Sequence, residues 1–378
     1  MARPKRILLL YGSEPDPLFL ERARALHLTE GCEVHFAYWR RGATAIRIPF
    51  REVIPAERFI PIDLPNPQGN MARRLALYLR FAFKLRRVIG SVDPDGVYAV
   101  SLAMCGVARL AMLGKRKPRR MYELMDQYGT RLSWWRRWLY RRAVGGVATT
   151  IIQSPAVVEH LQANRLDDTI RPHLVVPPGP SDWEYEHRPR SDGGPVVIGC
   201  FGYLRSASIL NTLIEAAKLV AEEGYPIALR FAGAGPHANL IRAAAAEANA
   251  AWLSHSGPFE YFGEYRSLFQ QADVVFAAYT QRLPNNTTHI ARRFCEAVAS
   301  GVPVIVAAGS YMARLVERER CGWSVNPTSA TAMAALLRQI CDNPAERDMS
   351  KVNPEFKAWN RFETHAERWR AALLRALA

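Results

Sequence analysis

A basic and an acidic side chain at helical spacing are the most specific candidates for chemistry in this chain. Arg293 and Glu296 lie in the first part of the run Arg292–Ile305, which predicts a helix. That helix ends at Gly301, before the apolar strand-like run Val302–Ile305. A spacing of three places both side chains on one helical face, where a guanidinium and free backbone N–H groups can bind a diphosphate and a carboxylate can accept ribose hydroxyls. The pattern indicates a nucleotide-binding helix, although these residue types taken alone favour a surface ion pair beside an ordinary turn.

A carboxylate beyond a predicted strand is the second candidate. Asp126 follows the strand predicted over Arg120–Leu124, and active sites of open α/β sheets lie at the carboxyl ends of their strands. A carboxylate in a closed site can act as a general base. The same position suits a helix N-cap aspartate, which is an equally good interpretation. Glu123 is the second choice for a base.

These candidates need a scaffold, and the chain predicts one of alternating strands and helices. Apolar runs of strand length alternate with helical periods, which is typical of parallel sheets built from β-α units. The strands expected in the first half are Ile7–Tyr11, Val34–Tyr38, Gly96–Val100, Arg120–Leu124, Val147–Gln153 and His173–Val176. Those expected in the second half are Val196–Gly202, Ala228–Ala232, Val274–Ala278 and Val302–Val306. The predicted fold class is therefore α/β.

A segment rich in proline and glycine separates the two halves. Residues 179–195 show neither a strand nor a helix period, and such a composition is typical of a linker. A length of 378 residues also suits two domains. We therefore predict Rossmann-like domains over residues 1–178 and 196–350. An amphipathic helical pattern, with Trp359 and Trp369 among charged residues, predicts C-terminal helix within residues 351–378.

The run from Arg292 to Ile305 extends the arginine–glutamate pair into a longer motif. It resembles the signature of bacterial GT-B glycosyltransferases, particularly glycosyltransferase family 4, which consists of a basic residue, an apolar pair and Glu-Ala-Met-Ala-x-Gly-x-Pro-Val-Ile. Other similar motifs follow the family's order: Ser154, Pro177–Gly179, Cys200–Tyr203, Leu213–Ala216, Gly233–Pro236, Gly257, Leu268 and Ala272–Val274. The resemblance covers nearly the whole chain and is strongest from Gly199 to Gly322.

The resemblance implies a GT-B architecture, in which two Rossmann-like parallel-sheet domains face each other across a cleft. It implies transfer of a sugar from a nucleotide diphosphate sugar bound by the C-terminal domain to an acceptor bound by the N-terminal domain. Residues 351–378 are expected to pack back on the N-terminal domain. The implied donor-binding residues are Gly202, Tyr203, Arg205, Gly233, Gly235, Thr288, Arg292, Arg293 and Glu296.

The chain departs from family 4 at three positions. Family members usually carry two glutamates eight apart, where this chain has Thr288 before Glu296, and they carry diphosphate-binding basic residues where this chain has Tyr203 and Ser208. The arginines that can supply the missing charge are Arg205, Arg292 and Arg293. Xanthan-type glucuronosyltransferases, which invert the anomeric centre, show a similar reduced pattern. In them an aspartate matching Asp126 is the base.

Positive charge is concentrated in a few stretches of the first half, and the chain as a whole has a net charge of +15. Solvated helix faces usually explain such runs, but tryptophan and arginine together are typical of helices that lie in a membrane interface. The residues expected to contact a membrane or a lipid-linked acceptor are Arg73, Arg80, Lys84, Trp134, Trp135, Arg137 and Trp138. We therefore expect peripheral binding to an anionic membrane surface.

The remaining features narrow the class of protein. Six cysteines occur singly, a spacing that forms neither a zinc site nor a disulfide framework and favours the cytoplasm. The chain shows no signal peptide and no run of about 20 apolar residues, so we expect a cytoplasmic protein on the inner face of the cell membrane. No nucleic-acid-binding motif accompanies the charge. Asp93-Pro94-Asp95 suits a turn, and we expect no metal and no cofactor.

Two other functions fit the same scaffold. The first is a catalytically silent GT-B protein that binds a nucleotide sugar at the membrane. Tyr203, Ser208 and Thr288 suggest it, because they stand where family 4 usually carries basic or acidic residues. A GT-B sugar-nucleotide epimerase is the second, and it would not need membrane-type helices. The leading hypothesis is glycosyl transfer to a lipid-linked saccharide in bacterial surface polysaccharide or glycolipid assembly, with a hexosyl or glucuronosyl donor.

Overall fold

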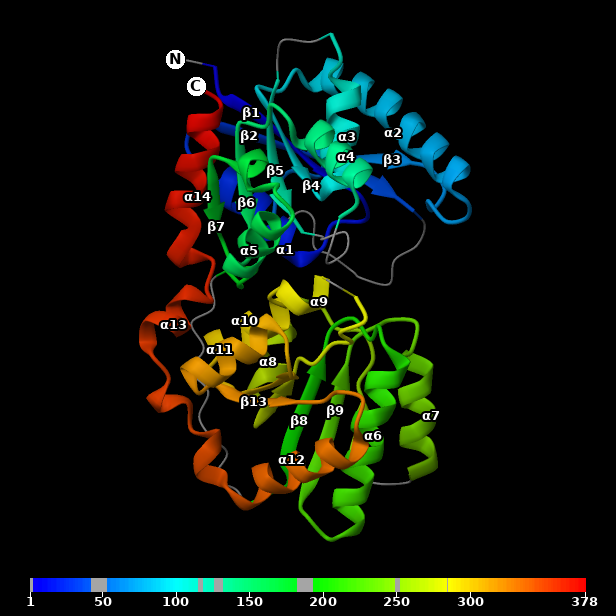
Figure 1. The fold of residues 1–378 in the computed structure, drawn as a ribbon, viewed down its shortest axis with the longest axis vertical. Coiled ribbons are helices and arrows are strands. Elements are labelled where there is room, and N and C mark those ends of the chain that lie inside the picture. The colour runs from blue at the N-terminus through cyan, green and yellow to red at the C-terminus, as the bar shows by residue number, and fades with distance from the viewer. Residues whose placement is uncertain are drawn as a thin grey trace. The chain divides into compact units, whose positions relative to one another are not determined.

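The computed structural model describes residues 3–41, 53–114, 118–125, 132–181, 193–248, 252–283 and 285–378. The chain forms two compact units, each built on a parallel sheet (Figure 1). Among the described residues, the first unit runs to Val176 and takes up the chain again at His365, and the second unit lies between Pro177 and Thr364. The predicted α/β class with two Rossmann-like sheets is confirmed.

The sheet of the first unit has the strand order β3-β2-β1-β4-β5-β6-β7. Its strands are β1 (Lys5–Tyr11), β2 (Cys32–Arg40), β3 (Phe59–Asp63), β4 (Gly96–Val100), β5 (Arg119–Leu124), β6 (Thr149–Ile152) and β7 (His173–Val175). The order changes direction between β1 and β4, which is where open α/β sheets place their ligands. We did not predict β3, because it is a half-exposed edge strand interrupted by Pro61.

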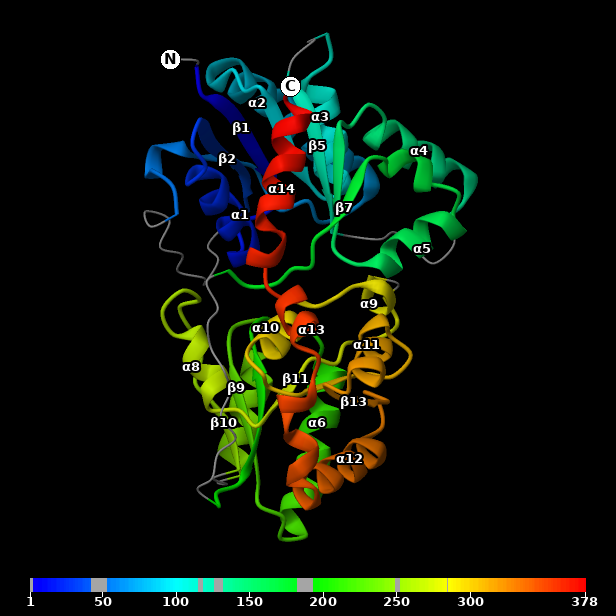
Figure 2. The same ribbon diagram turned by 90° about the vertical axis from the view of Figure 1, so that its left-hand side faces the viewer.

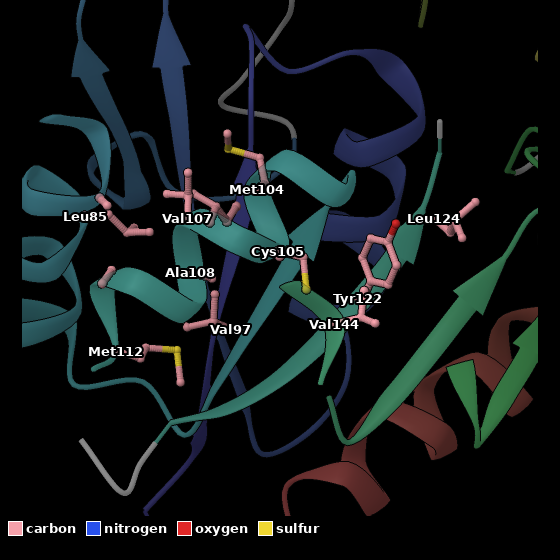
Figure 3. Close-up of a cluster of buried hydrophobic side chains, with 14 of the residues drawn as sticks. Leu85, Val97, Met104, Cys105, Val107, Ala108, Met112, Tyr122, Leu124 and Val144 are labelled. Atoms are coloured by element: carbon pink, nitrogen blue, oxygen red, sulfur yellow. The ribbon is translucent and has the colours of Figure 1, made fainter. Parts of the chain in front are cut away.

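Helices cover both faces of this sheet. They are α1 (Pro17–His27), α2 (Met71–Val92), α3 (Leu102–Ala111), α4 (Trp134–Val144), α5 (Pro155–Ala163) and α14 (Glu363–Ala376). Right-handed crossovers put α1 on one face and α2 to α5 on the other, because the strand order runs in opposite directions from β1. Strand residues such as Leu8 and Val97 share one buried core with α2 to α5. Figure 3 shows Val97 in this core with Met104 and Val107 of α3.

Helix α14 covers part of the other face of this sheet (Figure 2). Its Trp369 is fully buried, and the indole Nε1 donates to the Tyr98 hydroxyl over 3.3 Å. The Arg22 guanidinium lies 5.4 Å from the centre of the indole ring. The predicted C-terminal helix is in fact two helices, α13 (Pro354–Trp359) and α14, which belong to different units. Asn360 ends α13 because its side chain donates to the Phe356 carbonyl.

The second sheet has the order β10-β9-β8-β11-β12-β13, with all strands parallel. Its strands are β8 (Val196–Phe201), β9 (Ile227–Ala232), β10 (Leu253–His255), β11 (Val274–Phe276), β12 (Val304–Ala307) and β13 (Gly322–Val325). Its helices are α6 (Ala207–Glu222), α7 (Ala238–Ala248), α8 (Tyr265–Gln270), α9 (Asn285–Thr288), α10 (Arg292–Ala299), α11 (Tyr311–Glu319), α12 (Ala330–Asp342) and α13. The four strands predicted here correspond to β8, β9, β11 and β12, whereas the short edge strands β10 and β13 were missed.

The packing of α14 gives a stability prediction. We expect Trp369→Ala to lower the free energy of unfolding by about 3–5 kcal/mol, because it empties a fully buried aromatic site and leaves Tyr98 without its donor. Denaturant titration of the purified protein measures the change. Arg368→Ala, at the exposed neighbouring position, is the control and should shift stability by less than about 0.5 kcal/mol. Equal effects of the two substitutions would contradict this account of α14.

Candidate functional site

Two glycine-containing loops of the second unit lie against each other at the carboxyl ends of β8 and β9. The amide of Gly202 donates to the Ala232 carbonyl over 2.8 Å. Gly233 has φ +132°, and a Cβ there would lie 1.9 Å from the Gly202 carbonyl oxygen. A Cβ at Gly235, with φ +151°, would lie 2.6 Å from the Leu204 carbonyl oxygen. Only glycine permits this close approach, so Gly233 and Gly235 set the shape of the loop that carries Tyr203 and Arg205.

The guanidinium of Arg293 lies beneath this loop. Arg293 comes from the first turn of α10 and is 9% exposed. Its Nη1 donates to the Phe276 carbonyl over 3.0 Å and to the Cys200 sulfur over 3.4 Å. A Cβ at Gly202 would lie 3.3 Å from its Nη2, so glycine also makes room for the guanidinium. Among the described residues, Nε of Arg293 has no hydrogen-bond partner.

The charge state of Arg293 follows from its surroundings. Burial by itself would lower the pKa of Arg293, but the phenol of Tyr279, the thiol of Cys200 and the carboxylate of Glu296 act against this and leave the pKa raised. Burial raises the pKa of Cys200, although the guanidinium opposes that rise. The group beneath the loop is therefore a guanidinium cation beside a neutral thiol. No carboxylate is hydrogen-bonded to it within the described part of the chain, and Arg293 also lines a pocket.

This pocket is open and has a volume of about 190 Å³. It is smaller than the roughly 300–1,000 Å³ of a pocket for a whole small-molecule ligand, and so suits one portion of a nucleotide sugar. Exposed Arg205 lines it, with its guanidinium carbon 5.5 Å from the centre of the Tyr203 ring. The lining residues that carry polar groups are Cys200, Tyr203, Arg205, Ser206, Tyr279, Thr280, Asn286 and Arg293. Two guanidiniums and several hydroxyl and amide groups therefore surround one pocket, an arrangement suited to a phosphate-bearing ligand.

Glu296 lies in a different cluster from the pocket. Its carboxylate is 1% exposed and accepts hydrogen bonds from the Tyr261 hydroxyl (2.6 Å), the Tyr265 hydroxyl (2.7 Å) and Nε of Arg292 (2.7 Å). The ion pair of α10 is thus Arg292–Glu296, at spacing four, and not Arg293–Glu296, at the spacing of three that we considered. Helix α10 is oriented so that Arg293 faces β8 and β11. In this orientation Arg292 lies beside the Glu296 carboxylate, which is one helical turn further along the chain.

The aromatic residues of this cluster were missed in the sequence analysis. The Arg292 guanidinium lies 4.7 Å from the centre of the Tyr261 ring, and the Tyr261 and Tyr265 rings are also 4.7 Å apart. An aromatic residue recurs every four residues at Tyr261, Tyr265 and Phe269. This spacing could have predicted that the three side chains lie on one face of a helix or turn. Nothing in the local sequence, however, connects that face to a glutamate 31 residues or more away.

The segment before α10 brings the remaining predicted donor residue near the pocket. Thr288 is the last residue of the short helix α9, and Asn286 of that helix lines the pocket. His289 follows, and burial lowers its pKa to about 4, with a further lowering by the Arg205 guanidinium. His289 is therefore neutral at neutral pH. It adds no positive charge beside the two arginines.

The acceptor-side candidates lie in the first unit. Glu123, at the carboxyl end of β5, is completely buried and accepts hydrogen bonds from the Tyr98 hydroxyl and, over 3.3 Å, from Nε2 of Gln153. Because Tyr98 also accepts from Trp369, this carboxylate belongs to the contact that holds α14. That position favours a structural role for Glu123. Asp126 lies outside the described residues.

The predicted membrane-contact residues lie on two helices of the first unit. Arg73, Arg80 and Lys84 are exposed on α2, and Trp134, Trp135, Arg137 and Trp138 lie on α4, where Arg137 alone is half-buried. In the described ranges, no helix is both long and apolar enough to cross a bilayer. The same ranges contain no cluster of three His, Cys, Asp or Glu side chains arranged to hold a metal ion.

Comparison with known proteins places this pocket in a known class of domain. Residues 181–354 match the family described as "Glycosyl transferases group 1". This part of the chain is a glycosyltransferase group 1 domain, which confirms the resemblance over these residues, whereas the similarity to xanthan-type enzymes stays a prediction. The two parallel sheets together form the GT-B fold.

Individual relatives are distant. "Putative colanic acid biosynthesis glycosyltransferase WcaL" of Salmonella typhimurium is 25% identical over 157 residues, which are 41% of this chain and 39% of that protein. The chain thus matches well under half the length of this curated relative. Anabaena Alr3699/HepE in complex with UDP has a TM-score of 0.70 and 14% identity, over 98% of this chain and 100% of the other. A "putative UDP-N-acetylglucosamine 2-epimerase" from Listeria monocytogenes has a TM-score of 0.65 and 16% identity, over 99% and 96%.

The Glu296 cluster leads to a second stability prediction. We expect Glu296→Gln to lower the free energy of unfolding by about 3–5 kcal/mol, because the amide leaves Arg292 without its counter-charge and offers one acceptor oxygen in place of two. Thermal or denaturant unfolding measures this. Glu222→Gln, which removes the exposed Lys218–Glu222 pair at the same spacing of four, is the matched control and should cost less than about 1 kcal/mol. A Glu296→Gln variant as stable as the control would show that the cluster has little structural role.

Proposed function

We propose that this protein is a glycosyltransferase that uses a nucleotide diphosphate sugar as its donor. The observation that carries the proposal is the pocket in the group 1 domain, where the buried Arg293 and the exposed Arg205 meet beside hydroxyl and amide groups. A diphosphate is the charged part of such a donor and the leaving group of the reaction. Two guanidiniums beside this pocket, one buried and one exposed, would stabilise the negative charge that develops on it.

The geometry supports a proposal of different tasks for the predicted donor residues. Arg205 and Arg293 are the diphosphate contacts, and they replace the basic residues that family 4 carries where this chain has Tyr203 and Ser208. Because the Glu296 carboxylate already accepts three hydrogen bonds, we propose that it positions Arg292 and Tyr261 beside the donor site rather than binding the ribose directly. Charge stabilisation by arginine also supports a reaction that needs no metal.

The relatives and the first unit support a proposal for the acceptor. WcaL is a putative glycosyltransferase of colanic acid biosynthesis, and HepE was solved with UDP. We propose that this chain likewise transfers a hexosyl or glucuronosyl residue during assembly of a surface polysaccharide or glycolipid. The exposed basic and aromatic residues of α2 and α4 suit an acceptor carried on a lipid diphosphate, used at the inner face of the cell membrane.

A sugar-nucleotide epimerase is the second candidate, since the Listeria protein shares the fold over nearly its whole length. An epimerase and a transferase both bind the donor, but only the transferase hands the sugar to an acceptor. The basic, aromatic surface of the first unit favours the transferase. An enzyme whose only substrate is a soluble sugar nucleotide would not need such a surface. A catalytically silent scaffold would bind the nucleotide and convert nothing.

Nucleotide binding tests the proposed donor site. We expect UDP or GDP to bind the wild type in isothermal titration, and Arg205→Ala to weaken that binding about 10- to 100-fold, since a charged hydrogen bond to phosphate is lost. Arg205 is exposed, so its loss should leave the unfolding curve unchanged. Arg242→Ala on α7 is the control and should bind as the wild type does. If neither nucleotide bound the wild type, or if Arg205→Ala bound normally, the donor site would lie elsewhere.

The rate of turnover tests the proposal that Asp126 is the general base. With the donor that binds, Asp126→Asn should reduce release of the free nucleotide by about 10²- to 10⁴-fold, the usual contribution of a general base, with nucleotide affinity unchanged. Release of UDP or GDP with loss of the sugar indicates transfer or hydrolysis, whereas conversion of the sugar within an intact donor, followed by NMR, identifies an epimerase. A fully active Asp126→Asn variant would remove this residue as the base.

A further inference from the structure

Large apolar side chains are exposed together on three neighbouring helices of the first unit. Helix α3 packs between α2 and α4, and all three cover the same face of the sheet (Figures 1 and 2). Ten large apolar residues on these helices, or directly after α3, are 43–75% exposed. They are Met71, Leu75, Leu79, Phe83, Leu110, Leu113, Trp134, Trp135, Trp138 and Leu139. We refer to these ten residues and the basic residues among them as the α2–α4 face.

Helix α2 shows that this exposure is not an incidental edge of the core. Its sequence carries two apolar stripes with a spacing of four, one through Leu77 and Phe81 and the other through Leu75, Leu79 and Phe83. The first stripe is buried in the core of the unit. The second is shifted by two residues, or about 200° around the helix, and so points directly away from that core. A helix that only covers a sheet needs one apolar stripe, so the second stripe requires another apolar surface.

Arginines fix the three helices to one another beneath this face. Nη1 of Arg86 on α2 donates to the carbonyls of Ala111 (3.0 Å) and Leu113 (2.7 Å) at the end of α3. Arg120 donates from β5 to the Ala143 carbonyl over 2.8 Å and to the Gly145 carbonyl, and Arg109 of α3 also binds the end of α4. The face is therefore a preformed layer that cannot bury its apolar residues by rotating a single helix.

The charge on the α2–α4 face has one sign. The three helices together contain 11 arginine and lysine residues and no aspartate or glutamate. Three of the arginines lie over exposed aromatic rings. The guanidinium carbon is 4.7 Å from the ring centre for Arg87 over Phe83, and 5.2 Å both for Arg136 over Trp135 and for Arg142 over Trp138. Such pairs place a cation next to an apolar ring, so that one residue can contact a phosphate while its neighbour enters an apolar layer.

We infer that the α2–α4 face docks into the headgroup region of an anionic lipid bilayer, with its apolar side chains inserted and its arginines on the lipid phosphates. A second copy of the chain is disfavoured as the occupant, because a symmetric contact would bring two basic surfaces together, and the three helices contain no aspartate or glutamate to pair with them. Nucleic acid would use the charge but not the ten apolar side chains. The inference rests on the proposed function in one respect only. A lipid-linked acceptor lies at the membrane surface, so the proposed function gives a reason why the protein should dock there.

Sedimentation with vesicles of defined composition tests the inference on the whole chain of 378 residues. We expect the wild type to bind phosphatidylcholine vesicles containing phosphatidylglycerol, and to bind pure phosphatidylcholine at least tenfold more weakly. The charge variant Arg73→Gln/Arg80→Gln/Lys84→Gln should bind the anionic vesicles on the order of a hundredfold more weakly. The apolar variant Leu75→Ser/Leu79→Ser/Phe83→Ser should lose binding to a similar degree, because insertion as well as attraction is required.

Matched controls separate docking from folding and from donor binding. Leu28→Ser removes an apolar side chain that is 70% exposed at the end of α1, on the other face of the sheet, and should bind vesicles as the wild type does. All variants should keep the unfolding midpoint and the UDP or GDP affinity of the wild type, because the residues changed are exposed and lie in the first unit. Vesicle binding without nucleotide binding would leave the docking surface intact and reject the glycosyltransferase proposal alone.

Three results would overturn the inference. One is a wild type that stays in the supernatant with anionic vesicles. Another is an apolar variant that binds them as strongly as the wild type, which would reduce the face to a charged surface. The third is self-association of the wild type in sedimentation velocity that the apolar variant abolishes, with no vesicle binding by either, which would identify a second copy as the occupant.

Discussion

The buried cation of Arg293 is the constraint on which the candidate site depends. Moving a guanidinium out of water is costly unless a hydrogen-bonded partner or a counter-charge compensates. Here the protein supplies a carbonyl and a thiol as hydrogen-bond partners, and the carboxylate of Glu296, which also favours the cation, is hydrogen-bonded to Arg292 and two tyrosines. Because no carboxylate among the described residues is hydrogen-bonded to Arg293, an anion in the adjoining pocket can pair with it directly. The electrostatics of the site therefore favour binding of a diphosphate.

The loops above Arg293 explain why small residues are needed around such a charge. Gly202 leaves room for the guanidinium, while Gly233 and Gly235 let the loop after β9 touch the loop after β8. Backbone packed against backbone holds Tyr203 and Arg205 in a fixed frame without any side chain between them. Glycines in this site thus act on its shape, and the arginines act on its charge.

Most of the fold was predictable because its strands and helices have a regular apolar periodicity. Part of the site was not predictable, because the sequence does not show which side of a helix faces its neighbours. The central strands were found because buried parallel strands are continuous apolar runs, whereas β3 was missed through Pro61. For α10, the sequence placed both arginines near the glutamate but could not say which of them faces it. For α2, the sequence showed two apolar stripes without showing that the one through Phe81 is the buried one. The tyrosines that hold Glu296 come from a distant segment, so no local pattern could connect them.

Helix α14 closes the first unit with residues that lie far along the chain. Between Val176 and His365 the ribosome adds 188 residues, which takes about 10 to 40 s at roughly 5–20 residues per second. During that interval Tyr98 and Arg22 are already synthesised, but the indole that covers them is not. The second unit, continuous from Pro177 to Thr364, can complete its own core first. The face of the first sheet that carries Tyr98 would then be completed only after the second unit has been synthesised, although this sheet is the first to leave the ribosome.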